Sequence, residues 1–177
     1  MTHFRYIFAV VAALSLAPFS SAATPRDFTG FVIRASDGDT FDVRRGDGAI
    51  VRVRLHYADA PEVAHNRYEV DQPLGEDAKS YAHSLLVGEL VTVHVVGISY
   101  ARVVADVVRA DGIDVASDLV SRGYAMLDKR FKPPRSLVAA ESQAKASRIG
   151  VWADAITVPP WEWRQEQRAQ RIARNKD

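Results

Sequence analysis

The sequence predicts an α+β fold in which five β-strands form a small, partly open barrel to which helices are added. Two patterns indicate this fold. Three segments with apolar side chains at every second position follow one another early in the chain, and two more come after a segment with helical spacing. The 177 residues are too few for two average domains and contain no internal repeat, so we expect one domain of this kind.

The first three strands are predicted at residues 31–35, 40–44 and 49–57. The turn Ser36-Asp37-Gly38-Asp39 separates the first two, and aspartate and glycine are typical turn residues. The third strand alternates most clearly, with apolar side chains on one face and basic ones on the other: Val51, Val53, Leu55 and Tyr57 opposite Arg52, Arg54 and His56. These segments form a meander.

A helix is predicted at residues 75–86, and strand patterns return at residues 90–96 and 102–109. Two more helices, at residues 114–122 and 136–148, are followed by glycine, which commonly ends a helix. Five strands with a helix between the third and the fourth have the order of an OB-type barrel.

The composition limits the chemistry that the chain can perform. Its 23 Lys and Arg residues against 22 Asp and Glu residues give a net charge of +1, which excludes binding of nucleic acid by bulk charge alone. The absence of cysteine excludes disulfide scaffolds, thiolate zinc sites and cysteine nucleophiles. Any active site must therefore use oxygen and nitrogen groups.

Residues 1–23 have the pattern of a signal peptide: a basic start, an apolar run and small residues at the end. The apolar run from Tyr6 to Ala17 is shorter than the roughly 20 residues that a membrane-spanning helix needs. We expect cleavage after Ala22 or Ala23, and a secreted or periplasmic monomer without a membrane anchor.

The rest of the chain divides into two segments. Residues 24–158 contain all the predicted strands and form the main domain. Residues 159–177 begin with two prolines and predict a C-terminal helix with two tryptophans and a basic tail. We expect this helix to dock through Trp161 or Trp163.

Candidate metal ligands lie in two of the turns. Asp39 precedes the second strand, and the third strand runs out into Asp59-Ala60-Pro61-Glu62. If the first and third strands are neighbours, Asp39 and Asp59 meet at one end of the barrel and can coordinate a hard cation such as calcium. An EF-hand is excluded, because a loop beginning at Asp37 has Asp42 where glycine is required.

The order and spacing of these motifs resemble the staphylococcal nuclease family. The resemblance covers roughly residues 28–152 and is carried by three motifs: Asp37-Gly38-Asp39-Thr40, the segment R-L-H-Y-A-D-A-P-E at residues 54–62, and Tyr100-Ala101-Arg102. It implies an OB barrel with three helices and a calcium-dependent phosphodiesterase site. It also implies DNA and RNA as substrates, cut at the 5′ oxygen to leave 3′-phosphates.

The resemblance further implies a role for each site residue. Asp39 and Asp59 would ligate Ca²⁺, with the carbonyl oxygen of Ala60 as a further ligand. Glu62 would orient or deprotonate the attacking water. Two arginines would hold the scissile phosphate and neutralise the charge that grows on its oxygens, and these are Arg54 and Arg102. We expect both to face the site, so that their loss lowers turnover with little loss of stability.

Some positions depart from the family pattern. Ala101 stands where the family has glycine, and Lys129 takes the position of an aromatic residue that stacks on a base, while Phe131 is kept. The alternative to an enzyme is a catalytically inactive nuclease-like OB module that binds nucleic acid or a protein. The presence of both arginines together with Glu62 favours the enzyme, since binding alone does not need this set.

Overall fold

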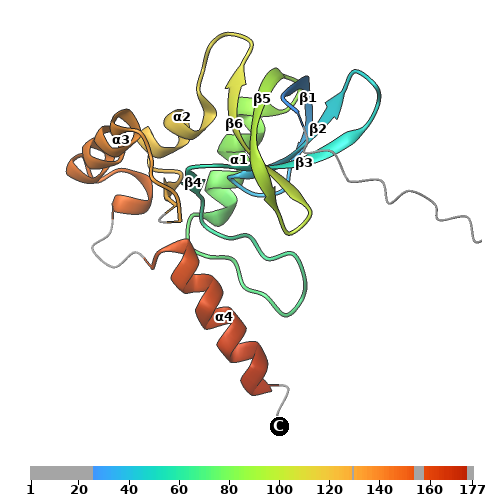
Figure 1. Ribbon diagram of the computed structural model, residues 1–177. Helices are drawn as coiled ribbons and strands as arrows, with labels where there is room; N and C mark the ends of the chain where they lie inside the picture. The colour runs from blue at the N-terminus through green and yellow to red at the C-terminus, as the bar shows by residue number, and fades with distance from the viewer. Residues whose placement is uncertain (1–25, 129, 154–157, 175–177) are drawn as a thin grey trace, which may run out of the picture.

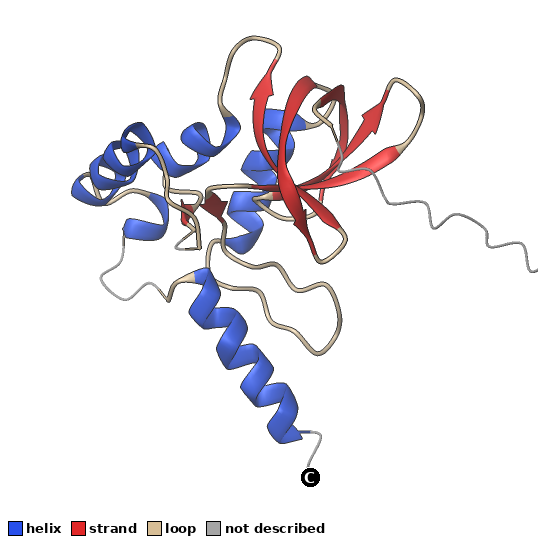
Figure 2. Ribbon diagram, in the orientation of Figure 1, coloured by secondary structure: helices blue, strands red, loops and turns tan. Residues whose placement is uncertain are grey.

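The computed structural model describes residues 26–128, 130–153 and 158–174. It has the predicted α+β architecture, a five-stranded barrel with helices to one side and below (Figures 1 and 2). The barrel consists of β1 (Phe28–Ala35), β2 (Thr40–Arg45), β3 (Ile50–Leu55), β5 (Leu90–Ser99) and β6 (Arg102–Arg109). The predicted signal peptide lies outside the described residues.

The barrel is closed, in the order β1-β2-β3-β6-β5. β1 pairs with β2 and β5, while β3 pairs with β6 in parallel, with Val53 opposite Val103. The predicted five-stranded OB-type barrel is confirmed, but it is closed and not partly open, and the first and third strands are not neighbours. The long connection from β3 to β6 provides the crossover that a parallel pair needs, and this pair completes the closure.

Alternating apolar residues fill the barrel. Phe41 and Val43 of β2 and Val53 and Leu55 of β3 are fully buried, as the predicted alternation requires. Helix α1 (Gly75–Leu86) adds buried residues to the same core. The strand ends of the barrel are thus supported by a closely packed core.

Two further helices pack beside the barrel, α2 (Val115–Ser121) and α3 (Arg135–Ala146), followed by the 3₁₀ turn η1 (Gly150–Trp152). Asp114 caps α2 by accepting a hydrogen bond from the Ser117 amide at 2.7 Å. A short sheet of β4 (Ala58–Asp59) and β7 (Met126–Leu127) was not predicted, because two-residue strands carry too little alternation to detect.

Helix α4 (Pro160–Arg174) extends away from the body beside the loop that joins β4 to α1 (Figure 1). It is the fourth α-helix of the described chain and corresponds to the helix predicted for the C-terminal segment. Pro160 is its one buried residue. In the described ranges, no helix is both long and apolar enough to cross a membrane.

Candidate active site

Strand pairing at one end of the barrel brings the two predicted metal ligands together. Thr40 lies opposite Arg54 in the β2–β3 pair, and the Leu55 amide donates to the carbonyl of Asp39 at 2.9 Å. Asp59 follows Arg54 by five residues, at the end of β4. Asp39 and Asp59 are each 1% exposed. They therefore meet through β2–β3 pairing and do not need the contact between the first and third strands.

Two glycines allow the backbone to pack closely around these residues. A Cβ atom on Gly38 would lie 2.6 Å from the Cβ of Ala60, and one on Gly75 would lie 2.3 Å from the carbonyl oxygen of Glu62. Real Cβ atoms do not tolerate either distance. The turn before Asp39 thus rests directly on Ala60, and the start of α1 rests on Glu62.

Arg54 connects the two aspartates. Its Nη1 donates to Oδ1 of Asp39 at 2.8 Å, and its Nη2 donates to Oδ1 of Asp59 at 2.5 Å. Arg54 is 7% exposed, so the sequence expectation that its loss would spare stability is corrected. Removing this guanidinium leaves two buried carboxylates facing each other, which is costly in a low-dielectric interior.

Asp39 is held by further hydrogen bonds, one from the hydroxyl of Thr40 at 2.9 Å and one from the Ala60 amide at 2.7 Å. Burial nevertheless raises the pKa of Asp39 to about 7, and the nearby Asp37 and Asp59 carboxylates push it in the same direction against the opposing effect of Arg54. The protein alone therefore disfavours the charged form of Asp39.

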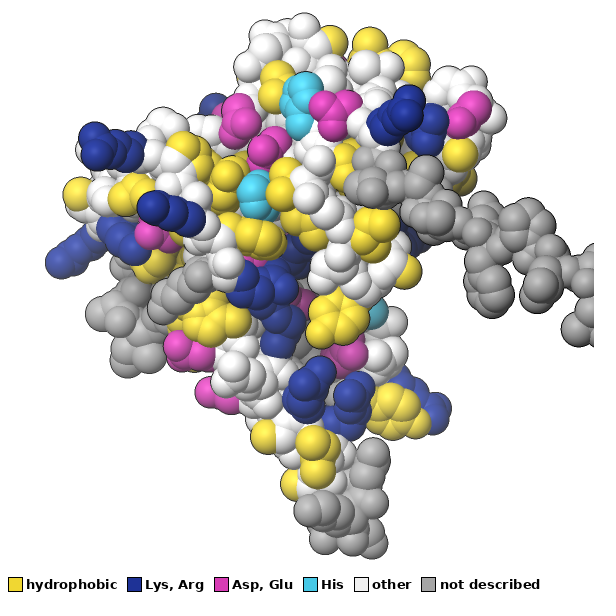
Figure 3. Space-filling model, viewed as in Figure 1, with side chains coloured by type: hydrophobic (Ala, Val, Ile, Leu, Met, Phe, Trp, Pro, Cys, Tyr) yellow, Lys and Arg dark blue, Asp and Glu magenta, His cyan; other side chains and the backbone are white. Residues whose placement is uncertain are grey.

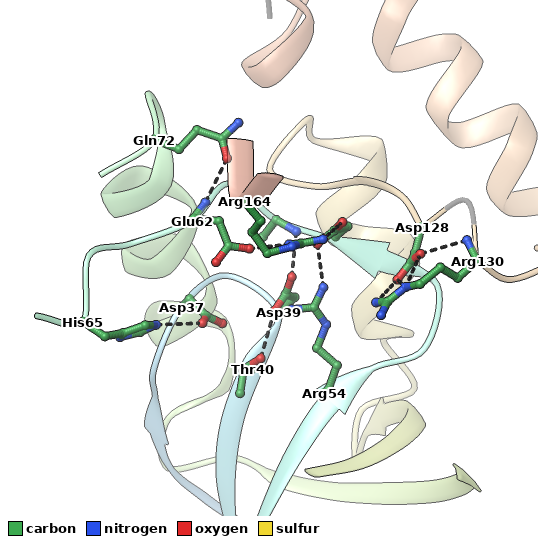
Figure 4. Close-up of polar contacts among 12 residues, drawn as sticks. Asp37, Asp39, Thr40, Arg54, Glu62, His65, Gln72, Asp128, Arg130 and Arg164 are labelled. Carbon is green, nitrogen blue, oxygen red and sulfur yellow. Dashed lines mark hydrogen bonds and ion pairs between the residues drawn. The ribbon is translucent and has the colours of Figure 1, made fainter. Parts of the chain in front are cut away.

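Arg164 of α4 enters the site from above (Figure 4). Its guanidinium forms a bidentate pair with Asp59, with N–O distances of 2.9 and 2.8 Å, and an ion pair with Glu62. Burial opposes ionisation of Asp59, but Arg164 and Arg54 outweigh it and hold the pKa of Asp59 below its usual value. Burial raises the pKa of Glu62, and Arg164 offsets only part of this rise.

A cleft of about 440 Å³ lies between the barrel end and α4, and it is lined by Arg54, Glu62, Arg102 and Arg164 among others. Arg102 is the first residue of β6 and follows the turn residues Tyr100 and Ala101, whose φ values are 50° and 60°. Positive φ at both positions is typical of the tight turns of β-hairpins. Ala101 adopts it at a steric cost that glycine would avoid.

The comparison with known proteins agrees with this geometry. A family model described as staphylococcal nuclease homologue matches residues 52–154. The chain belongs to the staphylococcal nuclease family. A protein of Escherichia coli named uncharacterized endonuclease is 33% identical over 150 residues, which cover 84% of this chain and 93% of that protein. A protein of Shigella flexneri named micrococcal nuclease is 30% identical over 168 residues, 89% of this chain and 91% of that protein.

The electrostatics of Asp39 in this family member fit a bound cation. Burial and the nearby carboxylates of Asp37 and Asp59 raise the pKa of Asp39 to about 7, and a cation beside it would stabilise its charged form. Oδ1 of Asp37 is buried without a hydrogen-bond partner. Both observations fit the family's calcium, with Asp39, Asp59 and the Ala60 carbonyl as the residues that would hold it.

The protein ligands of this nuclease-family site are few. Across the described ranges, no three His, Asp or Glu side chains form a group arranged to hold a metal ion. A cation at Asp39 and Asp59 would therefore take its remaining oxygens from the backbone, from water and from substrate, as hard cations commonly do.

The sequence analysis singled out Phe131 and Lys129 in connection with base binding, and the structure describes the first of them. The ring of Phe131 packs edge-on against the ring of His56, with centroids 4.4 Å apart, and His56 also contacts a carboxylate oxygen of Asp106 at 3.0 Å. Phe131 therefore has a packing partner in the protein. Lys129 lies outside the described residues.

Arg164 is the site residue that the sequence did not reveal. It lies outside the matched family segment, and 105 positions separate it from Asp59. The composition of the C-terminal segment showed five basic residues but gave no reason to select one of them. The signal that could have selected it was its position directly after Trp163, through which the helix was predicted to dock.

Proposed function

We propose that the chain is an exported, calcium-dependent endonuclease that hydrolyses the phosphodiester bonds of DNA and RNA and leaves 3′-phosphates. One observation carries the proposal: Glu62, Arg54 and Arg102 line a single cleft, and Arg54 also pairs with the buried carboxylates of Asp39 and Asp59. Membership of the nuclease family supports the same reaction class.

The arginines supply charge that the substrate requires. A phosphodiester is negatively charged and repels nucleophiles, and further charge develops on its oxygens as phosphorus becomes five-coordinate. Arg102 has no ion pair in the described part of the chain, so its guanidinium is available to a phosphate. Arg54 lies deeper and is committed to two aspartates. Arg102 therefore makes the direct contact more readily.

Glu62 accepts a proton from the attacking water. Burial raises the pKa of Glu62, which makes its carboxylate a stronger base than an exposed glutamate. Water attacks phosphorus, the bond from phosphorus to the 5′ oxygen breaks, and that oxygen takes up a proton as it leaves. The products are a 3′-phosphate and a 5′-hydroxyl.

Asp39, Asp59 and Ala60 form the cation end of this site. A calcium ion held there would supply positive charge that offsets the charge developing on the phosphate. Asp39 is ready for this role because its negative charge is poorly compensated by the protein alone. Asp59 is already compensated by two guanidiniums, so a cation has to compete with Arg164 for it.

The test is digestion of single-stranded DNA, double-stranded DNA and RNA, each with calcium and with excess chelator, followed by analysis of the ends. We expect cleavage with calcium only and 3′-phosphate ends. Full activity in chelator contradicts the proposal. Activity with zinc or magnesium that calcium inhibits contradicts the choice of metal.

Export is proposed from the sequence of residues 1–23. It is tested by N-terminal sequencing of the protein recovered from periplasm and medium. We expect a chain that starts after Ala22 or Ala23. A protein found only in the cytoplasm with its first residues intact contradicts export.

A further inference from the structure

Three of the four arginines of α4, all but Arg174, lie on one face of the helix. At about 100° per residue, Arg164, Arg168 and Arg171 fall within about 60° of one another. Glu162 and Glu166 lie about 160° away from Arg164, on the opposite face. Solubility alone does not require this separation of the charges. The separation therefore indicates that the arginine face has a function of its own.

The arginine face of α4 points toward the active site. Arg164 contacts Asp59 and Glu62, and Arg168 lines the active-site cleft together with Arg102. Arg168 also lines a smaller pocket of about 230 Å³ between α4 and the loop after β4, where Arg171 lies near Glu69. Figure 3 shows basic side chains gathered where α4 meets the body and along the helix.

The outer arginines of this face are available to a ligand. Arg168 and Arg171 are exposed, and neither has an ion pair within 4.0 Å among the described residues. Aromatic rings line the same cleft, namely Trp161 at the start of α4 and Tyr100, which is 87% exposed. Cationic side chains interleaved with aromatic rings are typical of surfaces that bind single-stranded nucleic acid without sequence preference.

We propose that α4 forms a second wall of the substrate groove and that its arginine face, defined by Arg164, Arg168 and Arg171, binds the backbone of a single strand on one side of the cleaved bond. This inference rests on the proposed nuclease function and adds the preferred substrate form. A duplex keeps its bases stacked inside and gives aromatic side chains no ring to stack on, whereas a single strand does. Arg168 and Arg171 lie outside the segment that matches the family.

The arginine face has a defined reach. Arg164 and Arg171 are seven residues apart, which is about 10 Å along the helix axis. A stacked strand rises about 3.4 Å per nucleotide, so the face spans about three nucleotides beyond the active site. Oligonucleotides shorter than this cannot contact both the active site and the outer arginines.

The test compares Arg168→Gln/Arg171→Gln with Ala169→Glu/Ala173→Glu. Both double variants lower the net charge by two and use good helix formers, but the second pair acts on the opposite face of α4. Fluorescence anisotropy measures binding of labelled oligo-dT of two and of eight nucleotides, and of a labelled DNA duplex, in chelator at several salt concentrations. A gel verifies that the oligonucleotides stay intact.

We expect the arginine variant to bind the eight-nucleotide strand about tenfold more weakly. The slope of the logarithm of its association constant against the logarithm of the salt concentration should become less steep by about 1.4. The two-nucleotide strand and the alanine control should change by about threefold at most. Arg168→Lys/Arg171→Lys should restore most of the affinity. Equal losses in both double variants, or duplex binding as tight as single-strand binding, overturn the inference.

Calcium-supported cleavage by the parent chain is measured in parallel. If the parent does not cleave, the proposed function fails, whatever the binding results. If it cleaves and the arginine variant binds the eight-nucleotide strand like the parent, only the role of α4 fails.

Discussion

The barrel end and helix α4 contribute to one cleft in different ways. Asp39, Arg54 and Asp59 are fixed by strand pairing and are almost completely buried. Arg164 comes from a helix with one buried residue and reaches the same carboxylates through ion pairs. Strands fix the positions of the acids, and the helix adds a partly exposed guanidinium that pairs with them.

Asp39 and Asp59 show the effect of this difference. Both are buried and both pair with Arg54. The pKa of Asp39 is raised to about 7, whereas the pKa of Asp59 lies below its usual value because Arg164 adds a second guanidinium. Arg164 therefore lowers the pKa of Asp59, while Asp39, which has no such contact, keeps a raised pKa.

The largest effect on stability is expected at the barrel end. Arg54→Ala leaves Asp39 without its guanidinium and Asp59 with only Arg164, and loss of one partner from a buried ion pair costs about 3–5 kcal/mol. Urea unfolding in chelator measures this loss. Arg52→Ala is the matched control, since Arg52 pairs with Asp42 while its own side chain is 47% exposed. Equal losses in both variants contradict a special role for Arg54.

Arg102→Ala separates activity from stability. Arg102 is half-buried, lines the cleft and has no ion pair in the described ranges, so its loss should leave the free energy of unfolding nearly unchanged. Turnover should fall by about two to three orders of magnitude, as for other lost contacts to transition-state charge. Parallel losses of melting temperature and activity would make Arg102 structural.

Asp39→Asn tests the uncompensated charge at the barrel end. Because the folded pKa of Asp39 is raised from an ordinary value of 3.8 to about 7, its contribution to stability is complete below pH 3.8 and is lost as the pH rises through 7. The free energy of unfolding of the parent relative to Asp39→Asn should therefore fall from pH 4 to pH 7 in chelator. Calcium should raise the free energy of unfolding of the parent at pH 7 and so reduce this fall. It should leave the free energy of unfolding of Asp39→Asn unchanged. A difference that stays constant with pH contradicts the raised pKa.

Arg164→Ala gives the smallest expected change in stability. Its side chain is 36% exposed and Asp59 keeps Arg54, so solvent screening limits the loss to about 1 kcal/mol. Trypsin should nevertheless cut α4 faster, because Arg164 makes the ion pairs that attach the helix to the barrel end. Arg168→Ala, which removes no ion pair of the described structure, is the control. Equal protection of α4 in both variants contradicts attachment through Arg164.

The sequence predicted most of the fold because the fold is built from local patterns. α1 and β6 begin and end at the predicted residues, and Asp114 caps α2 where its spacing indicated. Closure of the barrel was missed, since the parallel pairing of β3 with β6 depends on residues about 50 positions apart. Alternation indicates which residues face the core but not which strand lies next to which.

The candidate site was predicted where its residues lie in short motifs. Asp39, Arg54 and Asp59 meet at the end of the barrel, and Arg102 and Glu62 line the same cleft. The burial of Arg54 was not predicted, because alternation places it away from the core and says nothing about what else covers it. Arg164 could not be selected, because the direction of α4 depends on the whole fold.

The most direct test of catalysis at the barrel end is Glu62→Gln, which keeps the size of the side chain and removes its charge. Cleavage of DNA in calcium and binding of a nonhydrolysable nucleotide are measured for the variant and the parent. Loss of the base should depress cleavage by about two to four orders of magnitude and leave binding equal or slightly tighter, because a carboxylate that repels phosphate is gone. Cleavage within a few-fold of the parent contradicts the role of Glu62 and favours a binding module.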